Sequence, residues 1–212
     1  MSDLPVQRAE REELCDLLLD LGPEAPTLCE GWTTYDMAAH LFVREHNPVA
    51  SVGIVVSAAA SLHDKAILKA KADHSFEELV AKVRKGPPMH WKPVDAPFNT
   101  QEYFVHHEDV RRGDGDKTPR PAAEVAAIET ALWKGLQRGH RLATRKVHGV
   151  EINFVTPDGK TIHSGKGDES VTMTGRAGEI ILYLSGRKAA ANVELTGAPE
   201  AIAIVEEAEL GI

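Results

Sequence analysis

The sequence predicts a two-domain α+β protein, in which a helical domain over residues 1–144 precedes a small α+β domain over residues 145–212. Apolar residues recur every three or four positions through the first part, which is the period of an amphipathic helix. From about Arg145 they alternate with polar residues, as in half-buried strands. With 212 residues, 42% of them hydrophobic, the chain can bury a core, and disorder is excluded.

Cap and turn residues bound the first predicted helices. The first helix has one apolar stripe, ended by a Gly-Pro pair, at Leu14, Leu17, Leu18 and Leu21. Thr33 and Asp36 are spaced as a cap pair that opens a second helix, which extends to about His46. A third helix is expected from the Val49 region to about Lys71.

Three further signals complete the helical domain. Ser75 and Glu78 form a capping box at the start of a fourth helix. Asn99 or Thr100 is expected to cap another helix, which ends near Arg112. The last long helix has its apolar stripe at Val125, Ile128, Leu132 and Leu136. Stripes of this width, joined by loops, favour an antiparallel bundle of about four main helices.

The second domain is predicted to have the element order β-β-β-α-β-α. Val150, Ile152 and Phe154 alternate with polar residues, and the Pro-Asp-Gly-Lys segment at 157–160 has the composition of a tight turn. The remaining elements are expected as strands at 161–164 and 171–173, a helix at 177–184, a strand at 191–195 and a helix that opens at Pro199.

Charge and cysteine content exclude several classes of function. The net charge of −8 argues against nucleic acid or an anionic membrane as the main partner. Two cysteines exclude a disulfide scaffold, a four-cysteine zinc module and the His-x3-Cys-x2-Cys site of zinc anti-sigma factors. Neither Cys15 nor Cys29 has a histidine at a fixed close spacing, so both are interpreted as structural and no nucleophile is assigned.

The expected location is cytoplasmic. The N-terminal residues lack the apolar segment of a signal peptide. The longest uncharged run, residues 48–62, is too short to span a membrane and contains three serines, so it is interpreted as a buried helix.

The chain contains ten histidines, and one segment gives some of them a chemical context. On a helix, Glu102 and His106 lie one turn apart on the same face, with Val105 and Asp109 on the same stripe. If this stripe faces inward, the carboxylate and the imidazole need partners, and a metal ion satisfies both. The alternative is that the stripe faces water, while Tyr103, His107 and Val110 form the buried face. Spacing alone does not decide between the two.

His40 is the candidate third ligand, because it is flanked by small and apolar residues; the alternative is a core histidine bonded to a backbone carbonyl. His40, Glu102 and His106 together supply two imidazoles and one carboxylate, which suits Zn²⁺, Fe²⁺ or Ni²⁺ and leaves coordination positions open. Asp36 and Asp109, four residues before His40 and three after His106, are candidates to orient these imidazoles. Capping explains Asp36 equally well.

These residues resemble the DinB-type family of metal-binding bundles. The resemblance lies in residues 29–41, Cys-Glu-Gly-Trp-Thr-Thr-Tyr-Asp-Met-Ala-Ala-His-Leu, and in the later Glu-x3-His-x2-Asp spacing. More narrowly, the chain resembles the actinobacterial branch that includes mycothiol-dependent maleylpyruvate isomerase, where the three-histidine site becomes His, Glu, His, matched here by His40, Glu102 and His106. Residues 171–187, which end in Ser-Gly-Arg, resemble the small domain that follows the bundle in that branch.

The resemblance implies a DinB-like four-helix bundle, a sterol-carrier-like second domain, a divalent metal, usually zinc, and a low-molecular-weight thiol such as mycothiol. It implies a metal-dependent thiol S-transferase or isomerase acting on an electrophilic substrate, since a metal-bound thiol loses its proton at neutral pH. It also implies that Arg187 holds a substrate carboxylate, against the alternative of an arginine placed by a helix dipole. The alternative function is a non-catalytic protein with a structural metal and a small ligand in the second domain.

Overall fold

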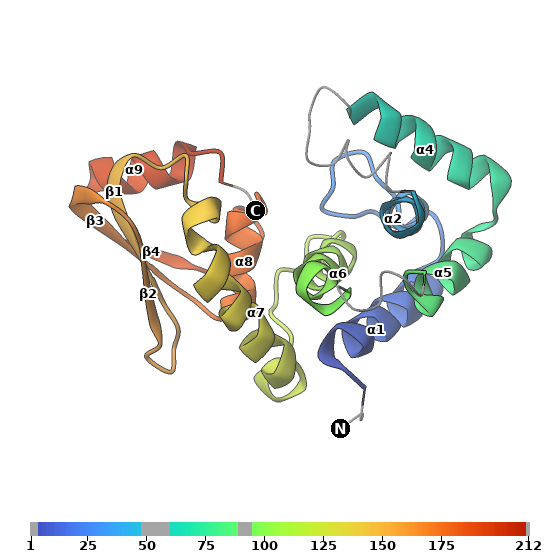
Figure 1. Cartoon of the computed structure of the whole chain (residues 1–212), viewed down its shortest axis with the longest axis horizontal. Helices are drawn as coiled ribbons and strands as arrows, with labels where there is room; N and C mark the ends of the chain where they lie inside the picture. The colour runs from blue at the N-terminus through green and yellow to red at the C-terminus, as the bar shows by residue number, and fades with distance from the viewer. Residues whose placement is uncertain (1–3, 48–59, 89–94, 211–212) are drawn as a thin grey trace. The chain divides into compact units, whose positions relative to one another are not determined.

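The computed structural model of the chain describes residues 4–47, 60–88 and 95–210 (Figure 1). These residues form eight helices and a four-stranded sheet, which confirms the α+β class. By their contacts they divide into two compact units, Met1–Asp116 and Lys117–Ile212. No helix in the described ranges is long and apolar enough to cross a membrane.

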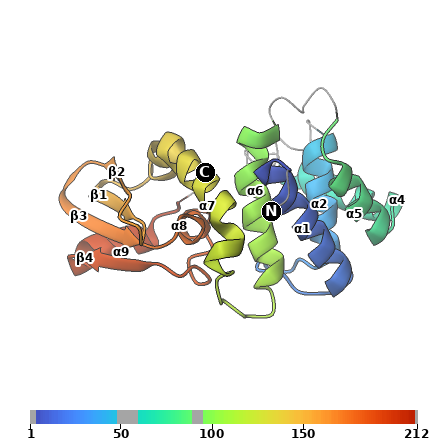
Figure 2. The same ribbon diagram turned by 90° about the horizontal axis from the view of Figure 1, so that it is seen from below.

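The first unit is a group of packed helices. Its elements are α1 (Val6–Leu21), α2 (Thr34–His46), α4 (Ala60–Asp73), α5 (Phe76–Lys85) and α6 (Asp95–Arg111). Helix α1 packs against α5 and α6, and α2 packs against α4 and α5 (Figure 2). Leu14, Leu18, Met37, Leu41 and Leu79 are fully buried between these helices. Of the stripe predicted for α1, Leu14 and Leu18 face this core and Leu17 is partly buried against it, whereas Leu21 is 46% exposed.

The two predicted capping boxes are present in this unit. Thr33 and Asp36 cap α2 reciprocally, and Ser75 and Glu78 do the same for α5. The cap predicted at Asn99 or Thr100 is wrong, because α6 already begins at Asp95. Asn99 lies within the helix, is buried, and uses its side chain to bind Glu45 and Arg44. The beginning of the helix expected from residue 49 lies outside the described residues.

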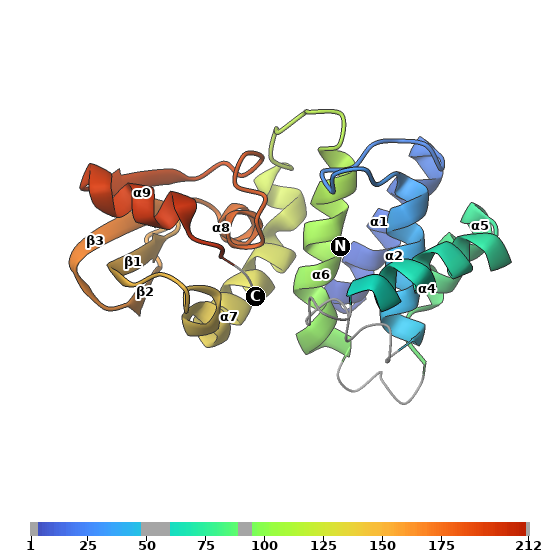
Figure 3. The same cartoon turned by 90° about the horizontal axis from the view of Figure 1, so that it is seen from above.

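The second unit consists of three helices and a mixed sheet in the predicted order after its first helix (Figure 3). Its elements are α7 (Ala122–Ala143), β1 (Gly149–Val155), β2 (Thr161–Gly165), β3 (Gly167–Thr174), α8 (Ala177–Leu184), β4 (Glu194–Gly197) and α9 (Pro199–Glu207). The strands are arranged as β2-β1-β3-β4, with β1 parallel to β3 and the outer pairs antiparallel. Buried residues of β1 alternate with half-exposed ones, as the sequence period predicts.

Helix α7 is placed differently from the sequence prediction, which counted it in the bundle and set the boundary after residue 144. By contact it belongs to the second unit, where it packs against α8 and β2. Its Glu129 carboxylate accepts a hydrogen bond from the backbone N–H of Gly178 at 2.9 Å. A change from helical to alternating period marks where the sheet begins, but it carries no information about which neighbour a preceding helix contacts.

Candidate metal centre

Helices α2 and α6 bring His40, Glu102 and His106 together. Each residue offers one ligand atom, and these three atoms all lie within 4.8 Å of one another. The rings of His40 and His106 are 4.8 Å apart at their centroids, and His106 Nε2 lies 3.5 Å from Glu102 Oε2. Both histidines are buried, whereas 33% of the Glu102 side chain is exposed. The group therefore has the composition of a three-ligand metal site with one side open to solvent.

His40 contains a buried polar atom that the folded chain does not satisfy. Its Nδ1 lies 2.8 Å from Nε2 of His63, on α4. Its Nε2 is buried and has no hydrogen-bond partner among the described residues. Buried polar atoms without a partner are rare in proteins because their desolvation is not compensated. A lone pair on this nitrogen fits a metal ion, since a coordinate bond would satisfy it.

His106 is oriented by a carboxylate. Its Nδ1 lies 3.0 Å from Oδ2 of Asp109, which is completely buried. The same oxygen accepts a hydrogen bond from the thiol of Cys29 at 3.4 Å. Because Nδ1 is held in this way, the Nε2 atom is the one that faces Glu102. This arrangement is typical of metal-ligating histidines, whose second nitrogen donates to a carboxylate.

Burial and charge shift the pKa values of the three residues in different directions. Burial, assisted by the neighbouring His106 and His63, lowers the pKa of His40 well below 6.5, so this imidazole is neutral at pH 7. Burial acts to raise the pKa of Glu102, but its hydrogen bond with His106 and the charge of Arg44 outweigh burial and bring it to about 2. Burial acts to lower the pKa of His106, and hydrogen bonds to Asp109, Cys29 and Glu102 instead raise it well above 6.5. An ionised carboxylate and a neutral imidazole are both metal-ready ligands.

Two other groups of donors occur in the first unit, and their atoms already bind one another. Cys29, His106 and Asp109 form one group, in which the thiol and the imidazole share the Asp109 carboxylate. Glu10, Glu13 and His107 form the other, in which His107 Nδ1 lies 2.8 Å from Glu10 Oε1. Of the three groups, the one with His40 is the one that contains a buried ligand atom recorded without a partner.

The sequence left two alternatives for α6, a polar stripe that faces inward or one that faces water, and neither describes this helix. Every residue from Tyr103 to Val110 is buried, so both of the faces considered are covered. The polar residues of the helix are paired instead of solvated: Tyr103 donates to Glu45 at 2.6 Å, and His107 pairs with Glu10. A periodicity argument assumes one apolar face, and this helix instead has polar partners supplied by α1 and α2.

Of the two aspartates predicted to orient the imidazoles, Asp109 contacts His106, as its spacing suggested, and Asp36 has other partners than His40. The Asp36 carboxylate accepts hydrogen bonds from Thr33 and Lys71, so the capping alternative describes it. The position beside Nδ1 of His40 is occupied by His63. Arg187 follows α8 in the second unit and donates to the Ser185 carbonyl at 2.6 Å, so its substrate-binding role stays a prediction.

Sequence reasoning missed His63 and Arg44. His63 is not among the predicted ligands or their partners, although it lies on the buried face of α4, four residues before Ile67 and seven before Ala70. That spacing is the signal that identifies it. Arg44 lies one helical turn after His40, and its Nε is 3.2 Å from Glu102 Oε2. No motif indicates this ion pair, because Glu102 is on a different helix.

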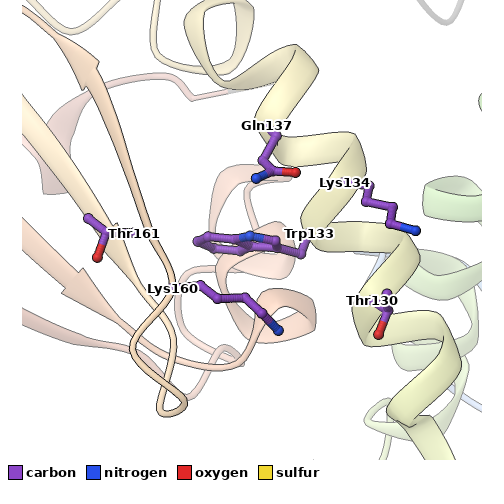
Figure 4. Close-up of a pocket in the computed structure, with 6 residues that line it drawn as sticks. All are labelled: Thr130, Trp133, Lys134, Gln137, Lys160 and Thr161. Atoms are coloured by element: carbon purple, nitrogen blue, oxygen red, sulfur yellow. The ribbon is translucent and has the colours of Figure 1, made fainter.

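A separate pocket lies within the second unit, between α7 and the turn that joins β1 to β2. Figure 4 shows its lining residues, which are Thr130, Trp133, Lys134, Gln137, Lys160 and Thr161. None of these is a histidine, cysteine, aspartate or glutamate, so this pocket offers no metal-ligating side chain.

Comparison with known proteins identifies a shared fold. No protein-family model matches the sequence, and no curated protein does. The structure resembles the crystal structure of a mycothiol-dependent maleylpyruvate isomerase, with 16% sequence identity, a TM-score of 0.52 and coverage of 93% of this chain and 96% of that one. A mutant of such an isomerase matches with 15% identity, a TM-score of 0.50 and the same coverage. The chain therefore has the fold of these enzymes over nearly its whole length.

Proposed function

We propose that this chain binds a divalent metal ion, zinc by preference, through His40, Glu102 and His106, and that it acts on a low-molecular-weight thiol. The observation that carries the proposal is the buried, unpartnered Nε2 of His40, placed with two further ligand atoms within 4.8 Å. Two imidazoles and one carboxylate are the ligands of several catalytic zinc sites, which keep a position open for exchange. Nickel and iron accept the same ligand set.

When bound, a divalent ion supplies positive charge that lowers the pKa of a coordinated thiol, so that the nucleophilic thiolate is present at neutral pH. The residues of the chain prepare the ligands for this role. The hydrogen bond with His106 and the 3.2 Å contact with Arg44 lower the pKa of Glu102, and Asp109 fixes the orientation of His106. The exposed third of Glu102 gives the site access to solvent, as ligand exchange requires.

The substrate part of the proposal rests on the shared fold. The similar structures are described as mycothiol-dependent isomerases. We infer that the thiol is of the mycothiol type and that the reaction is its transfer to an electrophile or a thiol-assisted isomerisation. Arg187, in the second unit, is proposed to bind a carboxylate of the electrophile, because a guanidinium forms paired hydrogen bonds with carboxylates.

Elemental analysis of the purified protein tests the metal site. The wild type is expected to hold about one divalent ion per chain, and His40→Ala, Glu102→Ala and His106→Ala are each expected to lose it while remaining folded. His46→Ala is the matched control, because it removes an exposed imidazole from the same helix as His40. Full metal retention in both histidine variants would reject the site.

Turnover tests the thiol chemistry separately. The zinc-loaded protein is mixed with mycothiol and a chromogenic aryl halide, and loss of free thiol is followed. The wild type is expected to catalyse this consumption, and Glu102→Ala is expected not to. A protein that retains zinc, consumes no thiol with any electrophile and isomerises no electrophile in the presence of the thiol would support the non-catalytic alternative, in which the metal is structural and the second domain holds a small ligand.

A further inference from the structure

His40 and His63 form a buried pair of imidazoles behind the proposed metal site. Nδ1 of His40 lies 2.8 Å from Nε2 of His63, and the two rings meet at 82° with their centroids 4.9 Å apart. His40 is 5% exposed and His63 is 6% exposed. Helix α4 fixes His63 in this place, because the same face of α4 carries Ile67 and Ala70, which pack in the core.

The contact restricts where the proton of a neutral His40 can reside. A neutral imidazole carries one N–H and one lone pair, and the partner of one nitrogen determines the state of the other. If Nδ1 of His40 donates to His63, the lone pair of His40 is on Nε2, which is the metal-ready form. If His63 donates instead, Nε2 of His40 carries a hydrogen in a position where no acceptor is recorded among the described residues. Both arrangements make the same single hydrogen bond between the two rings, and only the first leaves a lone pair on Nε2 of His40 for a metal ion.

We propose that His63 is a positioning residue for the metal site, which accepts the Nδ1–H of His40 and thereby holds the lone pair on Nε2. This inference rests on the proposed metal-binding function. His63 does for His40 what Asp109 does for His106, with a neutral imidazole in place of a carboxylate. Partners of this kind orient metal ligands, and their removal typically weakens metal binding about 10- to 100-fold.

The tautomer of His40 tests the proposal in the metal-free protein. Long-range proton–nitrogen NMR correlations distinguish the two tautomers, and the His40 signals are assigned by their absence from His40→Ala. The wild type is expected to carry the His40 proton on Nδ1, and His63→Leu is expected to lose this preference. A wild-type His40 protonated on Nε2 would overturn the proposal. The wild-type measurement depends neither on metal binding nor on the folding of a His63 variant.

Zinc affinity gives the second test, measured by competition with a chromophoric chelator. His63→Leu places an apolar residue on the buried face of α4, and this variant is expected to bind zinc about 10- to 100-fold more weakly than the wild type. His63→Gln, whose amide oxygen can accept the same hydrogen bond, is expected to bind more tightly than the leucine variant. His74→Leu, just after α4, is the control with wild-type affinity. If the wild type binds zinc and His63→Leu binds it equally well, only the role of His63 is rejected, whereas a wild type that binds no zinc rejects the metal site itself.

Discussion

At the residue scale, the two histidines of the proposed site differ in the group that holds Nδ1. A carboxylate holds His106 and an imidazole holds His40. The Asp109 carboxylate contributes to the raised pKa of His106, while burial lowers that of His40. Because metals bind neutral imidazoles, His106 has to release a proton on binding and His40 does not. Glu102, which is ionised beside Arg44, supplies the negatively charged ligand next to these two histidines.

The first prediction at this scale concerns Asp109. Asp109→Asn keeps the size of the side chain and removes the charge that orients His106, so zinc affinity is expected to fall about 10- to 100-fold. A chelator competition titration measures the change. Asp114→Asn, an exposed acid shortly after α6, is the matched control. Equal affinity in the two variants would show that His106 is held by something other than this carboxylate.

The second prediction concerns Cys15. Burial raises the pKa of its thiol to about 12, so almost none of it is thiolate at pH 8. In the native protein Cys15 is expected to resist iodoacetamide at pH 8 and to react once urea unfolds the chain. Peptide mass mapping reports the modification site by site. Rapid alkylation of Cys15 in the folded protein would contradict its burial in the core.

At the element scale, local signals predicted most of the structure, because caps and apolar periods each depend on only a few neighbouring residues. The capping boxes at Ser75 and Thr33 and the period-two pattern of β1 each correspond to an observed element boundary or face. Helix α6 was harder, since its buried face is polar and its partners lie on α1 and α2. Helix spacing indicated Glu102 and His106, the apolar neighbours of His40 indicated the third ligand, and the family resemblance matches all three. His63 depended on the tertiary contact between α2 and α4.

The prediction at this scale concerns the cap of α2. Asp36→Ala removes the capping box and the contact with Lys71, and should lower the free energy of unfolding by about 1 kcal/mol at pH 7 without loss of metal. Burial acts to raise the pKa of Asp36, but the hydrogen bonds from Lys71 and Thr33 lower it overall. The contribution is therefore present above the unfolded pKa of about 3.9 and lost as the pH falls through the lower folded value.

Denaturant unfolding at several pH values measures this contribution. The difference between wild type and Asp36→Ala should shrink as the pH falls below about 4. A difference that grows in acid has the wrong sign for a carboxylate with a lowered pKa. Metal loss in this variant would return Asp36 to the orienting role that its spacing from His40 first suggested.

At the scale of the whole molecule, contacts and sequence period divide the chain at different places. Contacts place the boundary between Asp116 and Lys117, and the change of period lies near residue 145. Helix α7 lies between the two boundaries, with Leu132 and Leu136 buried and its neighbours in α8 and β2. The period change identified the sheet, but only the packing shows which unit α7 completes.

Two fragments test the boundary. A fragment of residues 117–212 retains α7 over α8 and is expected to unfold in one cooperative thermal transition. A fragment of residues 145–212 exposes the apolar face of α8 that α7 covers, and is expected to lack such a transition. Circular dichroism melts compare the two. Equally cooperative unfolding of the shorter fragment would support the boundary at residue 144.

The most direct test of the central claim is an anomalous-scattering map, recorded at the zinc absorption edge, from a crystal of the zinc-loaded protein. The proposed metal site predicts a peak bonded to His40 Nε2, Glu102 and His106 Nε2, with zinc–nitrogen distances of about 2.0–2.1 Å. A zinc ion bound only by the Cys29 and Asp109 group or by the Glu10 and His107 group, or no bound zinc at all, would contradict it.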